Sequence, residues 1–549
     1  MYPKKELAQI IIAACRQFEI QTVVISPGSR NAPLTIGFSS HQDFETLSVV
    51  DERCAAFFAL GIAQQTQKPV AVVCTSGSAL LNYYPAIAEA YYSQIPLVVI
   101  SADRPSHFID IGDGQTIRQE NVFQNHILYS ANLKEFDSNN NIKALSKAFS
   151  LVRDVKGPIH INAPFDEPLY ETVSAMNNFQ FMVEKSNSED SIDYHNLASQ
   201  WNSAKKKMIL VGVHSPNTEL DMLLDKVADD PSVLVLTENT SNLHNKRFVN
   251  SIDNLIFNLT EEEFKSLQPD ILLTFGGLIV SKKIKKFLRK YSPNEHWHVN
   301  ELRAFDTYHV LSRHLKIDSQ TFFEKFYELV DYDNNSTYES KWTDYKNITR
   351  EKHNQYLKNS SFSDLKVFEQ VLKVIPDFSE VQFSNSAVIR YSQLYITNKT
   401  ITVFCNRGTS GIDGSTSTAI GAAYATQKPT TLITGDLSFF YDSNALWNEY
   451  IPKDFRIIMI NNSGGGIFKI IPGPKSSNAL KYFETPHCLT AEHLCKMYGF
   501  EYRTAQNLNT LEKEVACFYE DSGHPKLLEI FTPSDQNDLV LKEYINSLK

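Results

Sequence analysis

Two oxygen-bearing side chains, each placed directly after a short apolar run, are the part of this sequence best suited to hold a metal ion. Asp436 follows the run at residues 430–434, and Asn462 closely follows the run at residues 456–460. Short β-branched runs of this kind predict buried strands. The segment at residues 439–450 is long enough for the crossover helix that two parallel strands require. We therefore expect Asp436 and Asn462 to lie side by side at the carboxyl ends of neighbouring strands, where open α/β sheets bind ligands.

The oxygen donors in this stretch favour Mg²⁺ over zinc. A carboxylate, an amide oxygen and the backbone carbonyl of Gly464 are hard ligands, and Mg²⁺ fills its remaining positions with water and phosphate oxygens. The glycine turn Gly464-Gly465-Gly466 permits a phosphorylated ligand to approach the backbone closely. The alternative is an ordinary βαβ unit with an aspartate turn and a flexible glycine loop. The sequence thus predicts a phosphate site bridged by a metal ion, with that alternative left open.

Alternating strand and helix patterns divide the chain into three α/β segments. Polar stretches separate them, one interpreted as a linker at residues 186–203 and one that marks a boundary at residues 331–363. Strands joined by helical crossovers predict doubly wound parallel sheets, and we predict domains at residues 1–180, 190–335 and 360–549. The expected strands of the first two domains lie at residues 22–26, 70–75, 97–101, 159–163, 208–213, 233–236, 271–275 and 296–299.

The first and third segments share a repeated sequence. Six residues recur in the same order at one fixed offset, and a predicted strand follows each copy. At that offset Ser76 corresponds to Asp436, so only the second copy carries the metal ligands. The repeat suggests two related domains that have divided one function; the alternatives are a chance match or merely a shared helix-to-strand turn. The repeated residues are Gly61, Ala63, Thr66, Gln67, Lys68 and Pro69, and then Gly421, Ala423, Thr426, Gln427, Lys428 and Pro429.

The composition of this 549-residue chain is that of an ordinary globular protein. Hydrophobic residues make up 42% and charged residues 21%, and the length corresponds to about three domains. A net charge of −10 argues against nucleic acid or an anionic membrane as the main partner. The seven cysteines are odd in number and form no Cys-x-x-Cys pair, so we interpret them as buried thiols in a reducing compartment.

The N-terminal residues predict a helix rather than a targeting segment. Leu7, Ile10, Ile11, Ala14 and Phe18 keep helical spacing, and this apolar core is too short for a signal peptide. No apolar run of the sequence reaches the ~18 residues of a membrane span. We therefore expect a cytoplasmic protein.

The Gly-Asp and Asn-Asn pair at residues 435–462 resembles the metal-binding motif by which thiamine-diphosphate enzymes are recognised. Within that superfamily, six short motifs occur here in one order. Together they resemble the family of 2-succinyl-5-enolpyruvyl-6-hydroxy-3-cyclohexene-1-carboxylate synthases of menaquinone biosynthesis. The resemblance covers both outer segments and reaches the middle one only weakly. The motifs are Ser26-Pro27-Gly28-Ser29-Arg30, Asp51-Glu52-Arg53, Ser101-Ala102-Asp103-Arg104-Pro105, Asn406-Arg407-Gly408, Ser410-Gly411-Ile412-Asp413-Gly414 and Gly435-Asp436-Leu437-Ser438.

The resemblance implies three domains of the thiamine-diphosphate enzyme type and a site for thiamine diphosphate with Mg²⁺ or Mn²⁺. The metal would be held by Asp436, Asn462 and the carbonyl of Gly464. Glu52, just before a predicted helix at residues 54–63, would bond an aminopyrimidine nitrogen and promote loss of the thiazolium C2 proton. A carboxyl kept protonated by burial suits that role, whereas an acidic first turn otherwise only favours the helix dipole. The implied cofactor contacts are Glu52, Ser76, Gly77, Ser410, Gly411, Ile412 (the apolar wedge beneath the two cofactor rings), Gly435, Asp436, Leu437, Ser438, Asn462, Gly465, Ile467 and Phe468.

The resemblance also implies the reaction and its partners. 2-Oxoglutarate would be decarboxylated and its succinyl-semialdehyde carbanion added to isochorismate. The enzyme would be a homodimer or a dimer of dimers, with each site between the first domain of one chain and the third domain of another. A chain at −10 repels such anionic substrates unless local arginines reverse the field, and a planar guanidinium binds a carboxylate through two hydrogen bonds. By similarity the substrate residues are Ser29, Arg30, Arg104, Gln115, Ser386, Arg390 and Arg407.

Two departures from the family pattern bear on the substrate site. Gly114 precedes Gln115 where some relatives carry asparagine, so one polar contact is expected to be lost. Lys282-Lys283 stand where relatives can show Lys-Arg. Lysine cannot form the two parallel hydrogen bonds that a guanidinium makes with a carboxylate, and basic helix faces are usually solvated. We therefore do not count Lys283 among the substrate residues.

Two other functions remain as alternatives. The first is another thiamine-diphosphate decarboxylase or carboligase, against which the several arginines argue. The second is a non-catalytic ligand-binding relative, against which the joint presence of Glu52, Asp436 and Asn462 argues. A nicotinamide dehydrogenase fits poorly, because the glycines at residues 464–466 form no Gly-x-Gly-x-x-Gly.

Overall fold

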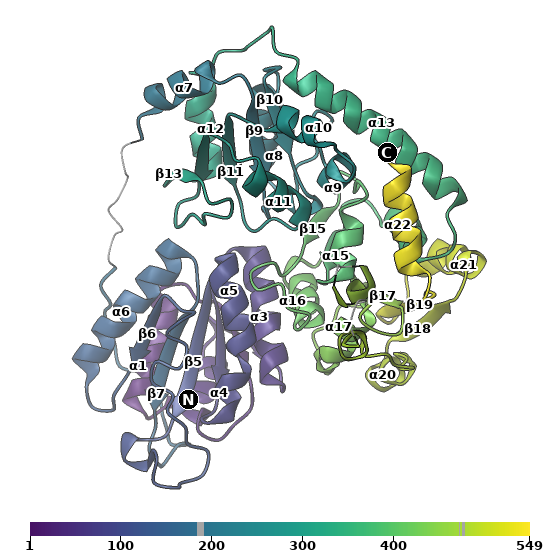
Figure 1. Cartoon of the computed structure of the whole chain (residues 1–549). Coiled ribbons are helices and arrows are strands. Elements are labelled where there is room, and N and C mark those ends of the chain that lie inside the picture. Colours follow the sequence, from purple (N-terminus) through teal and green to yellow (C-terminus); the bar gives the residue numbers. More distant parts are fainter. Residues whose placement is uncertain (184–191, 471–472, 475–477) are drawn as a thin grey trace.

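The computed structural model describes residues 1–183, 192–470, 473–474 and 478–549. In that part of the chain, three parallel sheets form the cores of three α/β domains. Figure 1 shows a purple-to-blue first domain, a teal middle domain and a green-to-yellow third domain. The predicted fold class is therefore confirmed, while the predicted domain boundaries stay predictions.

The first domain is built on a sheet in the order β3-β2-β4-β5-β7-β6, in which every neighbouring pair is parallel. Its strand β4 (Val70–Cys74) is entirely buried, because helices cover both faces of the sheet and such strands consist of continuous apolar residues. The predicted N-terminal helix is confirmed as α1 (Glu6–Gln17). The remaining strands are β2 (Thr22–Ile25), β3 (Glu45–Ser48), β5 (Leu97–Asp103), β6 (Tyr129–Asn132) and β7 (Ile159–Pro164), with β1 (Tyr2–Pro3) paired to β8 (Thr172–Val173). The other helices are α2 (Ala32–Ser40), α3 (Glu52–Thr66), α4 (Ser78–Asn82), α5 (Tyr84–Ser93), η1 (Ser106–Phe108) and α6 (Ser138–Val155).

The middle domain has a smaller parallel sheet in the order β10-β9-β11-β12-β13. A long helix, α13 (Tyr338–Asn359), leaves it along the outer edge of the molecule and reaches the third domain (Figure 1). The strands are β9 (Lys207–Val211), β10 (Val233–Leu236), β11 (Ile271–Phe275), β12 (Glu295–Val299) and β13 (Leu311–Leu315). The helices are α7 (Tyr194–Ser203), α8 (Thr218–Val227), η2 (Asn239–Ser241), α9 (Ile252–Ile256), α10 (Glu261–Leu267), α11 (Lys282–Lys290) and α12 (Ser319–Tyr327).

The third domain repeats the strand order of the first, as β15-β14-β16-β17-β19-β18. Its strands are β14 (Glu380–Phe383), β15 (Thr402–Phe404), β16 (Thr430–Gly435), β17 (Arg456–Asn461), β18 (Glu501–Ala505) and β19 (Lys526–Phe531). Its helices are α14 (Asp364–Val374), α15 (Ala387–Ser392), α16 (Ser415–Thr426), α17 (Asp436–Tyr441), η3 (Ser443–Leu446), α18 (Ile467–Ile470), α19 (Leu480–Glu484), α20 (Glu492–Tyr498), α21 (Leu508–Phe518) and α22 (Asn537–Ser547).

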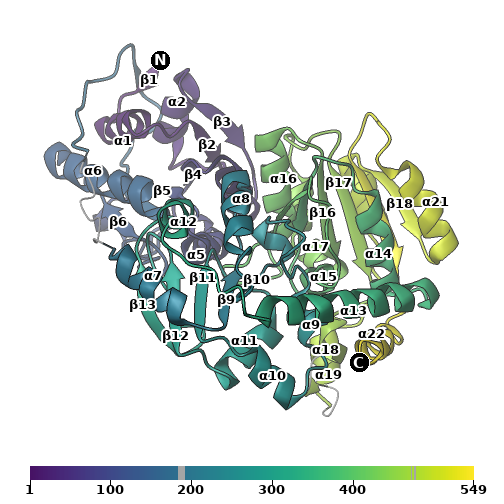
Figure 2. The same cartoon turned by 90° about the horizontal axis from the view of Figure 1, so that it is seen from above.

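The sequence repeat is a structural repeat centred on two helices, α3 and α16, which lie against each other (Figure 1). Figure 2 shows α16 between the sheet of the first domain and strands β16 and β17. A Cβ added to Gly61 would come within 2.1 Å of the Thr418 carbonyl oxygen, and one added to Gly421 within 2.0 Å of the Phe58 oxygen. The same repeat position thus supplies the closest backbone approach on each helix. Residues of both helices belong to one hydrophobic core that the first and third domains share.

The crossover between β16 and β17 differs from the prediction. The expected helix at residues 439–450 is wrong in its bounds, because α17 begins already at Asp436 and ends at Tyr441, and only the short 3₁₀ helix η3 follows. The buried carboxylate of Asp442 accepts hydrogen bonds from the backbone N–H (2.8 Å) and hydroxyl (3.0 Å) of Ser417 in α16. That contact fixes the chain where α17 ends.

Both polar stretches interpreted as separators contain helices, which corrects the linker prediction. Residues 194–203 form α7, capped by the Asp193 side chain and anchored by Trp201, which is 1% exposed; residues 186–191 lie outside the described residues. The boundary at residues 331–363 contains α13. Its buried stripe is narrow, which is why its helical period was missed: it consists of Tyr338, Trp342, Thr349, His353 and Leu357.

The cysteines are all free, and five of the seven are buried. The expectation of buried thiols is wrong for Cys488, which is exposed, and for Cys517, which is half-buried. Among the described helices, each is too short or too polar to span a lipid bilayer.

Candidate active site

The ends of strands β16 and β17 bring the predicted metal ligands together. The two strands are parallel neighbours in which Gly435 pairs with Ile460, so Asp436 and Asn462 follow adjacent strand ends. The Asp436 carboxylate is 3% exposed. Its Oδ1 accepts the backbone N–H of Leu437 at 2.7 Å, and its Oδ2 accepts that of Gly464 at 2.9 Å. The carboxylate is therefore held in place by the first turn of α17 and by the glycine turn.

Asn462 presents an unpaired oxygen at this site. Its Nδ2 donates to Oδ2 of Asp364 at 3.0 Å, while its Oδ1 is buried and has no hydrogen-bond partner. Buried polar atoms are normally paired, so an orphaned oxygen beside a carboxylate fits a metal ion as its missing partner. Gly464 has φ of +144°, and a Cβ there would lie 2.4 Å from the carbonyl oxygen of Glu484. Only glycine fits at that turn.

Asp364 holds the amide of Asn462. Its Oδ1 accepts the Thr532 hydroxyl at 2.6 Å and Nδ2 of Asn537 at 3.0 Å. Burial raises the pKa of Asp364 to about 6. His487 also reaches the site, with Nε2 3.2 Å from Oδ2 of Asp436. Within the described ranges no cluster of three or more His, Cys, Asp or Glu side chains is arranged to hold a metal, so a site here depends on amide and carbonyl oxygens, as predicted for Mg²⁺.

Glu52 occupies the first turn of α3, while its neighbour Asp51 caps that helix by accepting the Cys54 N–H at 3.1 Å. The capping role thus falls to Asp51. Burial raises the pKa of Glu52, which favours the protonated acid that its predicted role needs. No hydrogen bond or ion pair within the described chain joins Glu52 to Asp436, Asn462 or Gly464.

The turn after β4 lies against the loop that contains Gln115. The Ser76 hydroxyl donates to the Gln115 carbonyl at 2.9 Å, and the Gly77 N–H donates to Oε1 of Gln119 at 2.8 Å. Gly77 has φ of +88°, and Gln115 is exposed with φ of +55°. The structure thus brings Ser76, Gly77 and Gln115 together at the carboxyl edge of the first sheet. The expected loss of a polar contact at Gly114 stays a prediction.

Arg30 and Arg104 form a like-charged pair in the first domain. Arg30 is 5% exposed; its Nη1 donates to the Phe165 carbonyl at 2.9 Å, and its Nη2 lies 3.3 Å from Glu167. Burial lowers the pKa of Arg30, and the charge of Arg104 lowers it further. Nε of Arg104 is buried without a partner. Ser29 is exposed beside this pair.

Arg390 and Arg407 form a second like-charged pair in the third domain, in α15 and after β15. Nη1 of Arg407 donates to Oδ1 of Asn385 at 2.7 Å, and the Nε atoms of both arginines are buried and unpaired. Burial lowers the pKa of Arg390, and so does the charge of Arg407. Ser386 is half-buried at the start of α15, with φ of +69°. Lys283 instead lies over the ring of Phe257, with Nζ 5.3 Å from its centroid.

The remaining predicted cofactor contacts lie around the same edge of the third sheet. The Ser438 hydroxyl donates to the Ile412 carbonyl at 2.6 Å, and the Ile412 side chain is 37% exposed. Phe468 stacks on Phe483 with ring centroids 5.2 Å apart. Besides these, the group comprises Ser410, Gly411, Gly435, Leu437, Gly465 and Ile467.

Four residues of this region were not predicted from the sequence: Asp364, Asn385, His487 and Glu89. Asn385 stands in a polar triplet directly after β14, a position that signals a strand-end site. Glu89 is the lone charged residue of α5, which is a signal for a buried acid with a partner. Asp364 and His487 have no such signal, because their partners Asn462 and Asp436 are distant in the sequence.

Comparison with known proteins gives two family matches and several relatives over the whole chain. The N-terminal TPP-binding domain of thiamine pyrophosphate enzymes matches residues 5–131, and the middle domain of thiamine pyrophosphate enzymes matches residues 175–381. The 2-succinyl-5-enolpyruvyl-6-hydroxy-3-cyclohexene-1-carboxylate synthase of Flavobacterium johnsoniae is 54% identical, over 100% of both chains. The protein of that name from Flavobacterium psychrophilum is 53% identical over 100% of both chains. The one from Porphyromonas gingivalis is 36% identical over 99% of this chain and 97% of its own.

Proposed function

This chain belongs to the thiamine-diphosphate-dependent 2-succinyl-5-enolpyruvyl-6-hydroxy-3-cyclohexene-1-carboxylate synthases, and from that premise we propose that it decarboxylates 2-oxoglutarate and joins the remaining four-carbon unit to isochorismate. One observation carries the proposal: the similarity to synthases of that name extends over the entire chain, at up to 54% identity. The chemistry of the side chains described above supports it.

The metal ion is assigned to the end of β16 and β17. Asp436, Asn462 and the carbonyl of Gly464 would hold Mg²⁺ or Mn²⁺, and the buried unpaired Oδ1 of Asn462 supports this assignment. Thiamine diphosphate, bound through that metal, supplies the nucleophilic carbon and the electron sink that decarboxylation of a 2-oxoacid requires. The glycine turn leaves room for diphosphate oxygens next to the backbone.

Glu52 is assigned the role of the acid that activates the cofactor. Burial raises the pKa of Glu52, which favours the protonated acid that can donate a hydrogen bond to a ring nitrogen. Because Asp51 already caps α3, the helix does not need the Glu52 carboxylate for capping. Both observations support an activating role over a purely structural one.

The two arginine pairs are assigned to the substrates. Burial and the neighbouring like charge lower the pKa values of Arg30 and Arg390 even though carboxylates nearby act in the opposite direction, so an anionic ligand would stabilise each pair further. Two pairs suit two anionic substrates, 2-oxoglutarate and isochorismate. Ser29, Gln115 and Ser386 adjoin the pairs and would bind the remaining carboxylate or hydroxyl oxygens.

The enzyme is proposed to act in the cytoplasm as a homodimer or a dimer of dimers. The seven free cysteines support a reducing compartment. The structural repeat supports a site shared between two copies, because the candidate residues are divided between the two repeated domains. In that assembly, Glu52 of one copy would face Asp436 of the other, in line with closed two-fold symmetry.

The proposed activity is tested by incubating the protein with thiamine diphosphate, Mg²⁺, 2-oxoglutarate and isochorismate, and identifying the adduct by mass spectrometry. We expect the 2-succinyl-5-enolpyruvyl-6-hydroxy-3-cyclohexene-1-carboxylate product and CO₂. Pyruvate in place of 2-oxoglutarate serves as the control donor, since it has a methyl group where 2-oxoglutarate has a second carboxylate for an arginine to bind. Equal turnover of pyruvate would contradict the proposal and favour a simple 2-oxoacid decarboxylase.

A further inference from the structure

A buried carboxylate of the first domain binds the loop that follows Arg407 in the third domain. Glu89 in α5 is 1% exposed. Its Oε1 accepts the Gly408 N–H at 2.7 Å, and its Oε2 accepts the N–H of Thr409 at 2.7 Å and the Thr409 hydroxyl at 2.9 Å. Hydrogen bonds to a charged acceptor are the stronger kind. One side chain of the first domain therefore fixes two consecutive peptide groups of the third.

The loop also packs closely against α5. A Cβ on Gly408 would lie 2.6 Å from the backbone oxygen of Glu89, so glycine is needed for this approach. Ser93, one turn further along α5, also donates to Oε1 of Glu89, at 2.7 Å, in addition to the three hydrogen bonds that the carboxylate accepts from the loop. Figure 1 shows α5 on the side of the first domain that faces α16.

A second side chain holds the same loop from within the third domain. Oδ1 of Asn385 accepts a hydrogen bond from Nη1 of Arg407 at 2.7 Å. Its Nδ2 donates to the carbonyls of Asn406 at 2.7 Å and Gly411 at 2.8 Å. Arg407 thus lies between two anchors. Asn385 contacts the guanidinium directly, whereas Glu89 fixes the backbone immediately after it.

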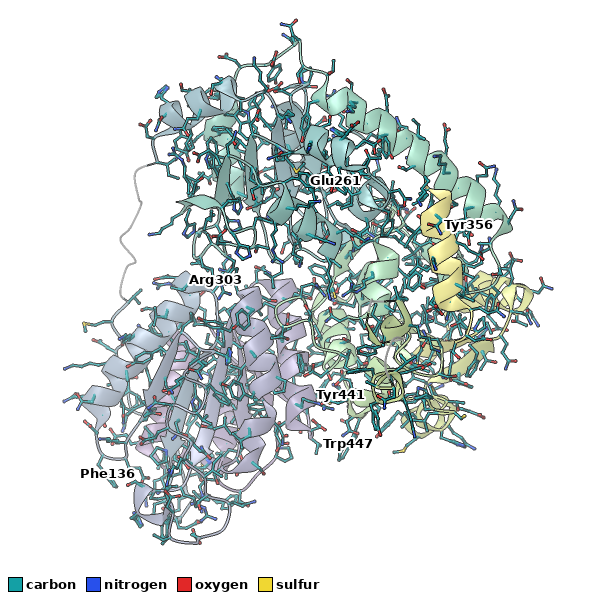
Figure 3. All side chains as sticks on the ribbon, viewed as in Figure 1. Phe136, Glu261, Arg303, Tyr356, Tyr441 and Trp447 are labelled. Atoms are coloured by element: carbon teal, nitrogen blue, oxygen red, sulfur yellow. The ribbon has the colours of Figure 1, made fainter. Side chains whose placement is uncertain are left out.

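The α5 helix also contacts the middle domain, through Arg303. The guanidinium of Arg303 donates to the Tyr91 carbonyl and lies over the rings of Tyr91 and Tyr92. Figure 3 shows Arg303 between the middle and first domains. Since α5 is held from both sides, the carboxylate of Glu89 is a rigid reference point for the loop at residues 406–411.

We propose that Glu89 is a positioning residue that sets the direction of Arg407 toward its substrate. The inference rests on the proposed substrate role of Arg407. Without the carboxylate, the backbone N–H groups of Gly408 and Thr409 lose the acceptor that ties them to α5, and the loop is free to shift away from that helix. Arg407 then binds a substrate carboxylate less well, although its own side chain is intact.

The test uses Glu89→Gln, which keeps the shape but turns one of the two acceptors into a donor. We expect kcat/KM to fall roughly 10- to 100-fold, mainly through KM, and for the same one of the two substrates that Arg407→Ala affects. In the double variant, Glu89→Gln should add almost nothing to Arg407→Ala, because both act through one guanidinium. Ser93→Ala is the matched control: it removes a donor to the same carboxylate but leaves the loop contacts intact, and it should retain wild-type kinetics.

The outcomes separate the inference from the proposal beneath it. Multiplicative effects of Glu89→Gln and Arg407→Ala, or an effect of Glu89→Gln on the other substrate, would overturn the positioning role alone. No effect of Arg407→Ala on either substrate would overturn the proposed role of Arg407 and the inference with it. If thermal unfolding shows that Glu89→Gln does not fold, Thr409→Val removes a hydroxyl donor from the same anchor. That variant should show a smaller loss of the same substrate and the same lack of additivity.

Discussion

At the scale of single residues, the candidate metal site is defined by how its oxygens are occupied. Asp436 has both oxygens engaged by backbone N–H groups, whereas Oδ1 of Asn462 is buried and unpaired. A 180° flip of the Asn462 amide would exchange its oxygen and nitrogen, so a neighbouring group must fix which of the two atoms faces the candidate metal site. Asp364 fixes this orientation, because its carboxylate accepts a hydrogen bond from Nδ2 of Asn462. The amide oxygen is left unpaired and available to the proposed metal ion.

Asp436→Ala should abolish metal-dependent binding of thiamine diphosphate. The variant loses the carboxylate and the contacts that fix it, so we expect affinity to fall by more than about 100-fold, measured by calorimetry with and without a chelator. Asp454→Ala is the control, since Asp454 is exposed just before the other end of β17. Unchanged, chelator-sensitive binding by Asp436→Ala would remove the metal site from this position.

Asp364→Asn should weaken binding of the metal ion although Asp364 is not itself a proposed metal ligand. An amide at this position places a donor among Asn462, Thr532 and Asn537, all of which donate to the carboxylate, and the Asn462 amide loses its fixed orientation. We expect Mn²⁺ affinity to fall about 10- to 100-fold, read by electron paramagnetic resonance of bound Mn²⁺. Thr532→Val, which removes only a donor to the far oxygen, should bind Mn²⁺ nearly as the wild type does; equal affinity in both variants would disprove the orienting role.

Glu52→Gln should stop activation of the cofactor and leave the fold intact. The amide keeps the size of the acid but cannot deliver its proton, and acid–base groups contribute about 10²- to 10⁴-fold. Exchange of the cofactor C2 proton for deuterium, followed by NMR, should slow by that factor. Asp51→Ala separates capping from activation, because it removes the α3 cap and should lower the unfolding temperature instead. Near-normal exchange in Glu52→Gln would mean that Glu52 is structural.

At the scale of elements, the sequence predicted most accurately the strands that are buried on both faces. Runs such as residues 70–75 and 97–101 are continuous and apolar because β4 and β5 are entirely buried. The stripe of α13 is too narrow to stand out. The crossover after β16 was misjudged, because the contact of Asp442 with Ser417 depends on tertiary structure.

The same distinction explains which site residues were found. Asp436 and Asn462 stand at strand ends, which the chain order alone predicts. Glu89 and Asp364 act through partners 319 and 98 residues away, and no local pattern encodes such a pairing. The two domains that contain them pack against each other through α3 and α16.

Gly421→Ala should destabilise the protein through that helix crossing. The added Cβ would lie 2.0 Å from the Phe58 carbonyl oxygen, so the helices must separate, at a cost of about 1–3 kcal/mol in the free energy of unfolding. Thermal or denaturant unfolding measures it. Gly523→Ala is the matched control, since a Cβ there meets no atom within 4 Å. Equal stability of the two variants would show that the crossing tolerates separation.

At the scale of the whole molecule, the candidate site residues are divided between the two repeated domains. The first domain contains Glu52 with the pair Arg30 and Arg104, and the third contains the metal ligands with the pair Arg390 and Arg407. Among the described residues, no hydrogen bond or ion pair connects the two sets. Two copies related by a two-fold axis would bring each half-site to its complement.

Large apolar side chains are exposed beside both half-sites. Tyr441 and Trp447 are each 54% exposed, at the end of α17 and just after η3, and Figure 3 shows them near each other. The others are Val50, Leu81 and Ile412, at 37%, 42% and 37% exposure. Exposed apolar surface that surrounds functional residues marks an interaction site. In the proposed homodimer, a second copy of this chain would cover this surface.

Trp447→Asp should therefore convert the proposed dimer to an inactive monomer, because a charge would be buried where an apolar ring packed. Sedimentation at assay concentration measures the change. Phe136→Asp is the control, since Phe136 is 97% exposed and lies on the far side of the first domain in Figure 3. A wild-type monomer with full activity would contradict the proposed assembly.

A sharper prediction concerns which chains share a site. Glu52→Gln and Asp436→Ala should each be inactive alone, yet their co-expression should restore activity. In a mixed dimer with shared sites, both substitutions fall into one site and the other site is intact. Random pairing then gives about a quarter of wild-type activity. If each site were built within one chain, every site in the mixture would contain one defect, and no activity would return. Steady-state turnover of the co-expressed mixture, compared with each variant alone, distinguishes the two arrangements. A mixture as inactive as its parents would mean that each site takes Glu52 and Asp436 from the same chain.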